Sequence, residues 1–367
     1  MKVLHVLRSE AWGGLEIYTL SLIEKLRQSG LDCELLCRQG SKLDLEAQQK
    51  NIPVRYALFT DLSSWTAIHV HRRQDLLLCR LSLIGRRKIK FFYSLYMNAP
   101  PKKDLYHKWI YSRINGMMSS SELLNEKIRQ NFPVDPQKVH LVRYGKDLTQ
   151  KRLSPAEIFE FKNKNGFATN KFIIGTMCRL DPGKGVGELA DSLSYLSNEE
   201  LAQLELWIVG DPTLLRINPD GSRVDHPESE ILLKKLKVIQ QDARYSNVLR
   251  LISFQRDFRP VLSSMDVFVL ATHKDETYSL AVIDALSLGI GLIGTEEAGT
   301  IEQIGSQQER GLFIKPKSSE SIAAAIRNCL NNPQILETRG KAGFQWATRE
   351  HNWDTTIKKI KQIYARA

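Results

Sequence analysis

The hydrophobic positions of this chain form short apolar runs that alternate with stretches of helical spacing. In the first half the runs occupy residues 3–7, 33–37, 90–95, 117–119 and 140–142. In the second half they occupy residues 172–177, 204–209, 248–252, 267–270, 291–294 and 311–314. Between them the apolar residues recur at helical intervals, as in residues 15–28, which end before Gly30. This alternation predicts parallel sheets covered by helices on both faces.

A polar stretch separates the two series of runs. It extends from Lys151 to Asn170, contains Pro155, and is interpreted as an interdomain helix and linker. We therefore predict two Rossmann-like α/β domains that face each other across a cleft, residues 1–155 and residues 156–351. A helix at about residues 352–367 is expected to pack back on the first domain. The polar segment from Pro212 to Ser229 is predicted to be a surface loop.

The charge of the chain is concentrated in its first half. The formal net charge is +11, but residues 1–155 alone carry 26 basic and 14 acidic residues, or +12, which leaves −1 for the remainder. Between Arg72 and Arg113 there are 11 basic residues and only two acidic ones. This asymmetry favours an anionic partner for the first domain, such as a membrane surface, an acidic glycan or a nucleic acid. The alternative is a solvated basic face.

Cysteine usage and apolar segments predict a cytoplasmic protein. The five cysteines are odd in number and scattered, which favours buried thiols in a reducing compartment over disulfides or a zinc site. The first apolar run is too short for a signal peptide, and the run after Leu76 is broken by Arg80. We expect no membrane-spanning segment.

Two acids flank the turn that follows the predicted strand at residues 267–270. Glu276 falls on the loop at the carboxyl end of the strand, where open α/β sheets bind ligands, and Asp284 falls inside the next helix. A carboxylate on that loop can accept hydrogen bonds from paired sugar hydroxyls, and Asp284 can reach ribose-type hydroxyls. The alternative is two exposed acids, one of them near a helix N-terminus where the dipole favours negative charge.

Two further segments suit an anionic ligand. Arg179 and Lys184 follow the strand at residues 172–177, and their charges fit a diphosphate group. Gly13 and Gly14 follow the first strand and open the first helix, where free N–H groups can meet an anion. Neither segment has the spacing of a dinucleotide-binding or Walker A loop. The alternatives are a solvated basic turn and a tight strand-to-helix turn.

A histidine pair stands near the basic segment. Alternation along the chain places His69 and His71 on one face, but a metal site would need a third ligand, and no nearby residue supplies one. We therefore predict no metal site. A role for His71 or Arg72 in lining the cleft and a packed histidine are both open interpretations.

Taken in order, these segments resemble a GT-B glycosyltransferase of the family 4 type. The residues that carry the resemblance are Gly13-Gly14-Leu15-Glu16, Arg143-Tyr144-Gly145-Lys146-Asp147-Leu148, Arg179 through Gly185, Glu276 through Asp284, and Gly294-Thr295 with Ala298-Gly299-Thr300-Ile301-Glu302. They span nearly the whole chain.

The resemblance implies a role for each site residue. Arg179 and Lys184 would hold the donor diphosphate together with the Gly13-Gly14 backbone, and the N–H groups near Ser279 and Leu280 would face the phosphates. Glu276 would contact the donor sugar and Asp284 the ribose. The family is metal-independent, needs no cofactor besides the nucleotide-sugar co-substrate, and retains anomeric configuration.

Departures from the family pattern fall near the sugar and the acceptor. The second acid is Asp284 rather than Glu, both glycines of E-G-F-G are replaced in Glu276-Thr277-Tyr278-Ser279, and Tyr96 stands near the place of a frequent histidine. These changes affect specificity more than reaction class. The predicted acceptor-binding residues are His71, Arg72 and Tyr96.

The sequence therefore predicts a retaining glycosyltransferase on the inner face of the cytoplasmic membrane or free in the cytoplasm. It would move a sugar from a nucleotide-diphospho-sugar to a lipid-linked or polysaccharide acceptor, in cell-envelope or surface glycan synthesis. The rival interpretations are a nucleotide-sugar-processing enzyme of the same architecture, resembling an epimerase, and a nucleic-acid-binding protein, for which no recognition motif is found.

Overall fold

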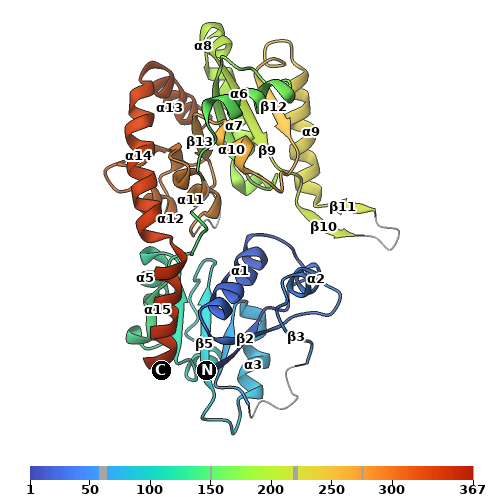
Figure 1. Ribbon diagram of the computed structural model, residues 1–367. Coiled ribbons are helices and arrows are strands. Elements are labelled where there is room, and N and C mark those ends of the chain that lie inside the picture. The colour runs from blue at the N-terminus through green and yellow to red at the C-terminus, as the bar shows by residue number, and fades with distance from the viewer. Residues whose placement is uncertain (58–63, 149–150, 218–221, 274–276, 367) are drawn as a thin grey trace. The chain divides into compact units, whose positions relative to one another are not determined.

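The computed structural model describes residues 1–57, 64–148, 151–217, 222–273 and 277–366. The chain forms two compact units, shown with their labelled elements in Figure 1. Unit 1 consists of Met1–Asp147 together with Glu350–Ala367, and unit 2 consists of Leu148–Arg349. The C-terminal helix α15 (Trp353–Arg366) thus belongs to unit 1.

Unit 1 contains a seven-stranded parallel sheet in the order β3-β2-β1-β4-β5-β6-β7. The strands are β1 (Lys2–Val6), β2 (Asp32–Leu36), β3 (Val54–Arg55), β4 (Ala67–Val70), β5 (Lys90–Leu95), β6 (Gly116–Ser119) and β7 (Val139–Leu141). Besides α15 its helices are α1 (Gly14–Gln28), α2 (Lys42–Gln49), α3 (Leu76–Ser82), α4 (Leu105–Tyr111) and α5 (Glu122–Asn131). The strand order reverses between β1 and β4, so their carboxyl ends form the crevice where such sheets bind ligands.

Unit 2 contains a six-stranded parallel sheet in the order β12-β9-β8-β13-β14-β15. The strands are β8 (Phe172–Met177), β9 (Leu204–Val209), β12 (Leu249–Ile252), β13 (Val267–Leu270), β14 (Gly291–Thr295) and β15 (Gly311–Ile314). The helices are α6 (Pro155–Lys164), α7 (Val186–Asp191), α8 (Asn198–Gln203), α9 (Pro227–Gln241), α10 (Arg259–Ser263), α11 (Leu280–Ser287), α12 (Ala298–Ile304), α13 (Ser319–Asn331) and α14 (Pro333–Glu350). Here the strand order reverses between β8 and β13.

Each sheet is buried beneath its helices, as Figure 1 shows for both units. All six residues of β9 are buried, which is why its sequence is a continuous apolar run apart from Glu205. The carboxylate of Glu205 is satisfied by the indole of Trp207 at 2.9 Å and the guanidinium of Arg250 at 3.0 Å. The prediction of two Rossmann-like α/β domains is confirmed.

One prediction of local structure is wrong. The segment from Pro212 to Ser229 is not a loop throughout, because β10 (Leu214–Ile217) and β11 (Arg223–Asp225) pair as an antiparallel hairpin and α9 begins at Pro227. Two short segments that flank an Asn-Pro-Asp-Gly sequence are typical of a hairpin, since these residue types favour turns.

All five cysteines are free thiols, and four of them are buried, the exception being Cys178, which is partly exposed. Within the described ranges, no helix combines the length and the apolar character needed to span a bilayer.

Candidate functional site

The cationic loop of unit 2 follows β8 and is fastened to the neighbouring strand end. Arg179 is exposed and Lys184 is half-buried at the end of a 3-10 turn, Pro182–Lys184. The turn is held by Asp181, whose carboxylate accepts a hydrogen bond from the Gly183 N–H at 2.8 Å. Both cations therefore lie at the carboxyl edge of the sheet, where the sequence placed them.

A glycine allows this loop to meet the end of β13. Gly185 has φ +68°, and a Cβ there would lie 2.1 Å from the carbonyl oxygen of Ala271. The His273 N–H also donates to the Gly183 carbonyl at 3.1 Å. The loop that carries Arg179 and Lys184 thus runs beside the segment that leads to α11.

The segment between β13 and α11 holds the predicted sugar-binding residues. Glu276 lies outside the described residues. Ser279 is buried and is the N-cap of α11, with its hydroxyl accepting from the Val282 N–H at 3.4 Å. Asp284 is half-buried inside the helix. Ser279 and Leu280 therefore lie at the N-terminus of α11, and Asp284 lies one turn further along the helix.

The backbone of Ser279 is held by a residue that the sequence did not single out. Gln303, in α12, accepts a hydrogen bond from the Ser279 N–H at 3.0 Å and donates one to the Ser279 carbonyl at 2.8 Å. The Ser279 N–H is thus already paired, and the Val282 N–H is capped by the Ser279 hydroxyl, so the N–H groups of Leu280 and Ala281 are the ones in this turn that suit a phosphate. The sequence could not indicate this contact, because Gln303 and Ser279 are 24 residues apart along the chain.

In unit 1 the glycine pair opens α1. Gly13 is the N-cap and provides no side-chain hydrogen bond, so the first-turn N–H groups of this 15-residue helix receive no side-chain cap from it. Gly13 has φ −170°, an extended conformation that any residue adopts. Glu16, in the same turn, is buried. The helix thus begins without a capping side chain at Gly13, but with the Glu16 carboxyl in its first turn.

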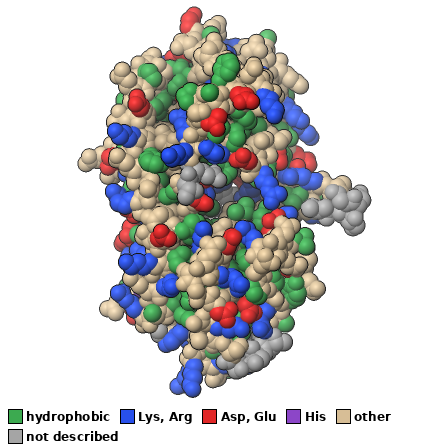
Figure 2. Space-filling model, viewed as in Figure 1, with side chains coloured by type: hydrophobic (Ala, Val, Ile, Leu, Met, Phe, Trp, Pro, Cys, Tyr) green, Lys and Arg blue, Asp and Glu red, His purple; other side chains and the backbone are tan. Residues whose placement is uncertain are grey.

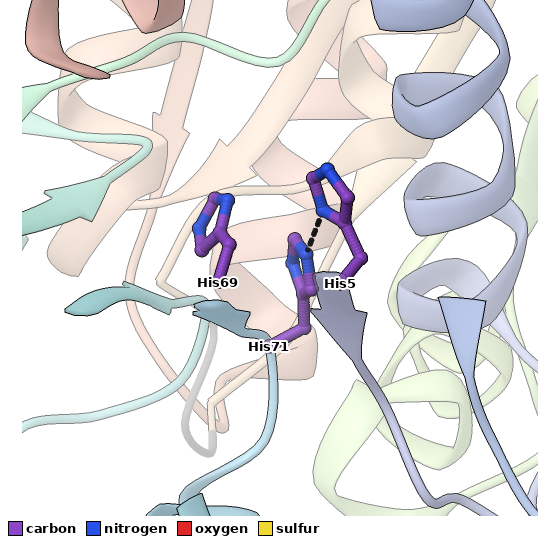
Figure 3. Close-up of side chains that lie close together, drawn as sticks. All are labelled: His5, His69 and His71. Carbon is purple, nitrogen blue, oxygen red and sulfur yellow. Dashed lines mark hydrogen bonds between the residues drawn. The ribbon is translucent and has the colours of Figure 1, made fainter. Parts of the chain in front are cut away.

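Three buried histidines lie together at the centre of unit 1. His5 of β1 pairs in register with His69 of β4, and His71 follows β4 directly. Their ring nitrogens lie within 4.8 Å of one another, and Figure 3 shows the three side chains gathered at the strand ends. His5 is the third imidazole that the sequence analysis did not find, because β1 and β4 are far apart along the chain.

The hydrogen bonds of this cluster favour a packed network over a metal centre. His71 bonds His5 at 2.9 Å and the Tyr96 hydroxyl at 3.0 Å, while His69 bonds the Tyr364 hydroxyl at 2.6 Å and the Ser94 hydroxyl at 2.8 Å. Of the six ring nitrogens of these three histidines, all of which the structure describes, only Nε2 of His5 lacks a hydrogen-bond partner. A metal ion would have to displace several of these bonds to gain three ligands.

Burial fixes the protonation of the cluster. It lowers the pKa of His5 from 6.5 to about 3, and it lowers the pKa values of His69 and His71 well below 6.5, with the neighbouring histidines as a second cause. All three rings are therefore neutral near pH 7.

The predicted acceptor residues are part of this network or border it. His71 is 2% exposed and contacts Tyr96, which is partly exposed and stacks on Tyr144 with ring centroids 5.8 Å apart. Arg72 is partly exposed and donates to the Arg8 carbonyl at 2.9 Å. His71 lies inside unit 1, so Tyr96 and Arg72 are the members of the predicted set that solvent reaches.

Helices α3 and α4 form a surface with both apolar and basic side chains, which we call the α3–α4 surface. Its exposed apolar members are Leu77, Leu81, Ile84, Leu105, Tyr106 and Trp109. Arg80 lies over the Trp109 ring at 4.3 Å and also donates to the Trp109 carbonyl at 3.3 Å, which joins the two helices. Figure 2 shows how hydrophobic side chains stand among charged ones on one face of the molecule.

A cavity of about 670 Å³ lies at the opposite end of the unit 2 sheet from the cationic loop. Its walls include Phe172 at the start of β8, Asp266 just before β13, and Gly291 at the start of β14. None of the predicted site residues lines it. In parallel sheets ligands bind at the carboxyl ends of the strands, so we place the site at the cationic loop.

Comparison with known proteins identifies relatives across the chain. The sequence model described as glycosyl transferases group 1 matches residues 157–346. Glycogen synthase of Mycobacterium tuberculosis is 23% identical over an alignment of 271 residues that covers 71% of this chain and 56% of that protein. MMP alpha-(1->4)-mannosyltransferase of Mycolicibacterium hassiacum is 20% identical over an alignment of 277 residues that covers 72% of this chain and 60% of that protein. The chain thus spans little more than half the length of these curated relatives.

Solved structures show the same fold. The structure of Anabaena HepE in complex with UDP matches with a TM-score of 0.86 and 16% identity, over 100% of both chains. The structure of that protein in complex with UDP-glucose matches with a TM-score of 0.82 and 17% identity, again over 100% of both chains. The likeness establishes the GT-B fold.

Proposed function

The chain belongs to the glycosyl transferases group 1 family, whose model matches 190 of its 367 residues, and we propose that it transfers a sugar from a nucleotide-diphospho-sugar to a glycan or glycolipid acceptor. The observation that carries this proposal is the cationic loop of Arg179 and Lys184, fastened to the end of β13 at the carboxyl edge of the unit 2 sheet. UDP-sugars are the first donors to examine, because Anabaena HepE was solved with UDP and with UDP-glucose.

In the proposed reaction the bond between the anomeric carbon and the β-phosphate oxygen breaks. Positive charge develops on the sugar ring, and negative charge develops on the departing diphosphate. Arg179 and Lys184 stabilise the diphosphate, an effect of about 3–4 kcal/mol for each well-aimed group. The N–H groups of Leu280 and Ala281 in the first turn of α11 add dipoles of the same sign.

The remaining donor contacts are assigned from the resemblance. Glu276 contacts the donor sugar, and Asp284 contacts the ribose. The acceptor hydroxyl attacks on the face that the diphosphate leaves, the leaving phosphate takes the acceptor proton, and the anomeric configuration is retained. The proposed reaction uses neither a metal ion nor a resident cofactor.

We place the acceptor on unit 1, which carries the excess of positive charge. The α3–α4 surface combines exposed apolar side chains with Arg80, Arg87 and Lys88, a combination that suits the interface of an anionic membrane. Tyr96 and Arg72 are the residues proposed to contact the acceptor. A lipid-linked acceptor of envelope or surface glycan synthesis fits this charge, and an anionic polysaccharide is the alternative.

The experiment measures thermal stabilisation of the purified protein by UDP-, GDP- and ADP-sugars, since a ligand that binds the folded state raises the melting temperature by mass action. The stabilising donor is then incubated with and without glycan acceptors, and the products are analysed. Transfer that depends on an acceptor supports the proposal. A sugar altered without any acceptor indicates an epimerase-like enzyme instead. Salt-dependent binding of DNA, with no stabilisation by any donor, indicates a nucleic-acid-binding protein.

A further inference from the structure

Gln303 makes a paired contact with one residue of the proposed donor site. Its side chain is 0% exposed, and its amide bonds both the N–H and the carbonyl of Ser279, at 3.0 and 2.8 Å. A primary amide offers a donor and an acceptor side by side, so it can pair with the N–H and C=O of a single residue. An apolar side chain of the same size would leave both backbone groups of Ser279 buried without these partners.

A second contact from the same helix holds the same turn. A Cβ at Gly299 would lie 1.8 Å from the Thr277 carbonyl oxygen, so the backbone of α12 approaches the turn as closely as only glycine permits. Gly299 and Gln303 are four residues apart and therefore lie on one face of α12. This face meets the chain at Thr277 and again at Ser279, two residues further on.

The far end of α12 is tied down as well. Arg310 donates to the Gln303 carbonyl at 2.8 Å and to the Glu302 carbonyl at 2.9 Å, and its guanidinium lies over the Trp346 ring at 4.6 Å. Gln303 is thus attached through its side chain to the start of α11 and through its backbone to Arg310.

We propose that Gln303 is a positioning residue for the donor diphosphate. Ser279 is the N-cap of α11, so its placement sets the direction of the first N–H groups of that helix. By holding both backbone groups of Ser279, Gln303 fixes the direction of the Leu280 N–H and of the first turn of α11 toward the proposed diphosphate. Gln303 itself does not touch the donor. This assignment rests on the proposed function, which places the diphosphate there.

The experiment uses the full chain and compares Gln303→Met, which keeps the volume and removes the hydrogen bonds, with the matched exposed variant Gln307→Met. The Kd is measured for whichever nucleoside diphosphate, UDP, GDP or ADP, the wild-type protein binds. We expect Gln303→Met to raise Kd about tenfold and Gln307→Met to leave it unchanged. Gln303→Leu, slightly smaller, provides a second variant if Gln303→Met is insoluble.

Hydrogen exchange at the Ser279 amide supplies a readout that does not depend on the ligand. In wild type this amide should exchange slowly, and in Gln303→Met it should exchange much faster, while the β13 amides stay protected. Slow exchange at Ser279 in Gln303→Met, or faster exchange with unchanged Kd, would overturn the positioning role. If wild type binds no nucleoside diphosphate, the proposed function fails, and the exchange result still reports whether the contact exists.

Discussion

The carboxyl edges of the two sheets are built in contrasting ways. In unit 2 the edge carries Arg179, which is exposed, and Lys184, which is half-buried, on a loop whose Gly185 permits close approach to Ala271. The half-buried Asp284 lies in the helix α11 that follows β13. In unit 1 the corresponding edge is filled by buried histidines whose nitrogens bond one another and nearby hydroxyls. Charged groups that solvent reaches can meet a ligand, whereas neutral groups that are already paired hold the strands in place. This contrast supports the proposed donor site at the first edge and a structural role for the buried histidines at the second.

Acidification gives the largest expected effect, and it should act on unit 1. Burial lowers the pKa values of His5 and His351 from 6.5 to about 3, so between these values the unfolded chain binds protons that the folded chain does not. Stability is therefore greatest above pH 6.5 and falls as the pH drops, by about 1.4 kcal/mol per pH unit for each histidine.

Hydrogen exchange at pH 7.5 and pH 5 measures this loss in unit 1 separately from unit 2. The matched substitution is His5→Gln, which should reduce the pH dependence by about one proton, with the exposed His226→Gln as control. Equal protection of β1 and β4 at the two pH values would contradict the buried, neutral state of the cluster.

Substitutions of Asp284 and Glu276 should distinguish contacts to the nucleotide from contacts to the sugar. Asp284→Asn should weaken nucleoside diphosphate binding about tenfold, because it removes a charged hydrogen-bond acceptor for the ribose. Glu276→Gln should lower turnover far more than nucleoside diphosphate affinity, because Glu276 is assigned to the sugar. Glu320→Gln, an exposed acid in the first turn of α13, is the control. The assignment of Glu276 to the sugar would be wrong if Glu276→Gln weakened the binding of the nucleoside diphosphate as much as it weakened the binding of the nucleotide-sugar.

The smallest effect concerns the α3–α4 surface. Each Lys or Arg near an anionic membrane contributes about 1 kcal/mol. Replacing the exposed residues Arg87 and Lys88 by glutamate should therefore weaken co-sedimentation with anionic vesicles and reduce its salt dependence. The exposed pair Lys234 and Lys237 of α9, replaced in the same way, is the control. If the wild-type protein does not co-sediment with anionic vesicles at low salt, an anionic glycan is favoured as the partner of the α3–α4 surface.

Local patterns sufficed for most strands. The bounds of β8, β9, β13 and β15 agree with the prediction, because buried parallel strands are continuous apolar runs between turn residues. The two-residue strand β3 has no such run, and β10 and β11, with four and three residues, are too short to show the alternation typical of a strand.

Contacts between segments that are distant along the chain could not be predicted from the sequence. His5 and His69 are neighbours only because β1 pairs with β4, a register that no pattern in either strand specifies. Gln303 is likewise 24 residues from Ser279 along the chain, and a glutamine in a helix shows no sign of its partner. The cationic loop was predictable because Arg179 and Lys184 follow a strand directly, and the strand determines at which edge they lie.

Binding of UDP to the full chain and to its Arg179→Ala/Lys184→Ala variant tests the central claim most directly, with Lys164→Ala as an exposed control. Isothermal titration calorimetry should show binding by wild type and the control. Binding by the double variant should be at least about 100-fold weaker, since two charge-assisted contacts to the diphosphate are lost, at about 1.5–3 kcal/mol each. GDP and ADP are titrated in parallel, so that the result does not depend on the base. A double variant that binds its nucleoside diphosphate as tightly as wild type, or a wild type that binds none, would contradict the assignment of the donor site to this edge of unit 2.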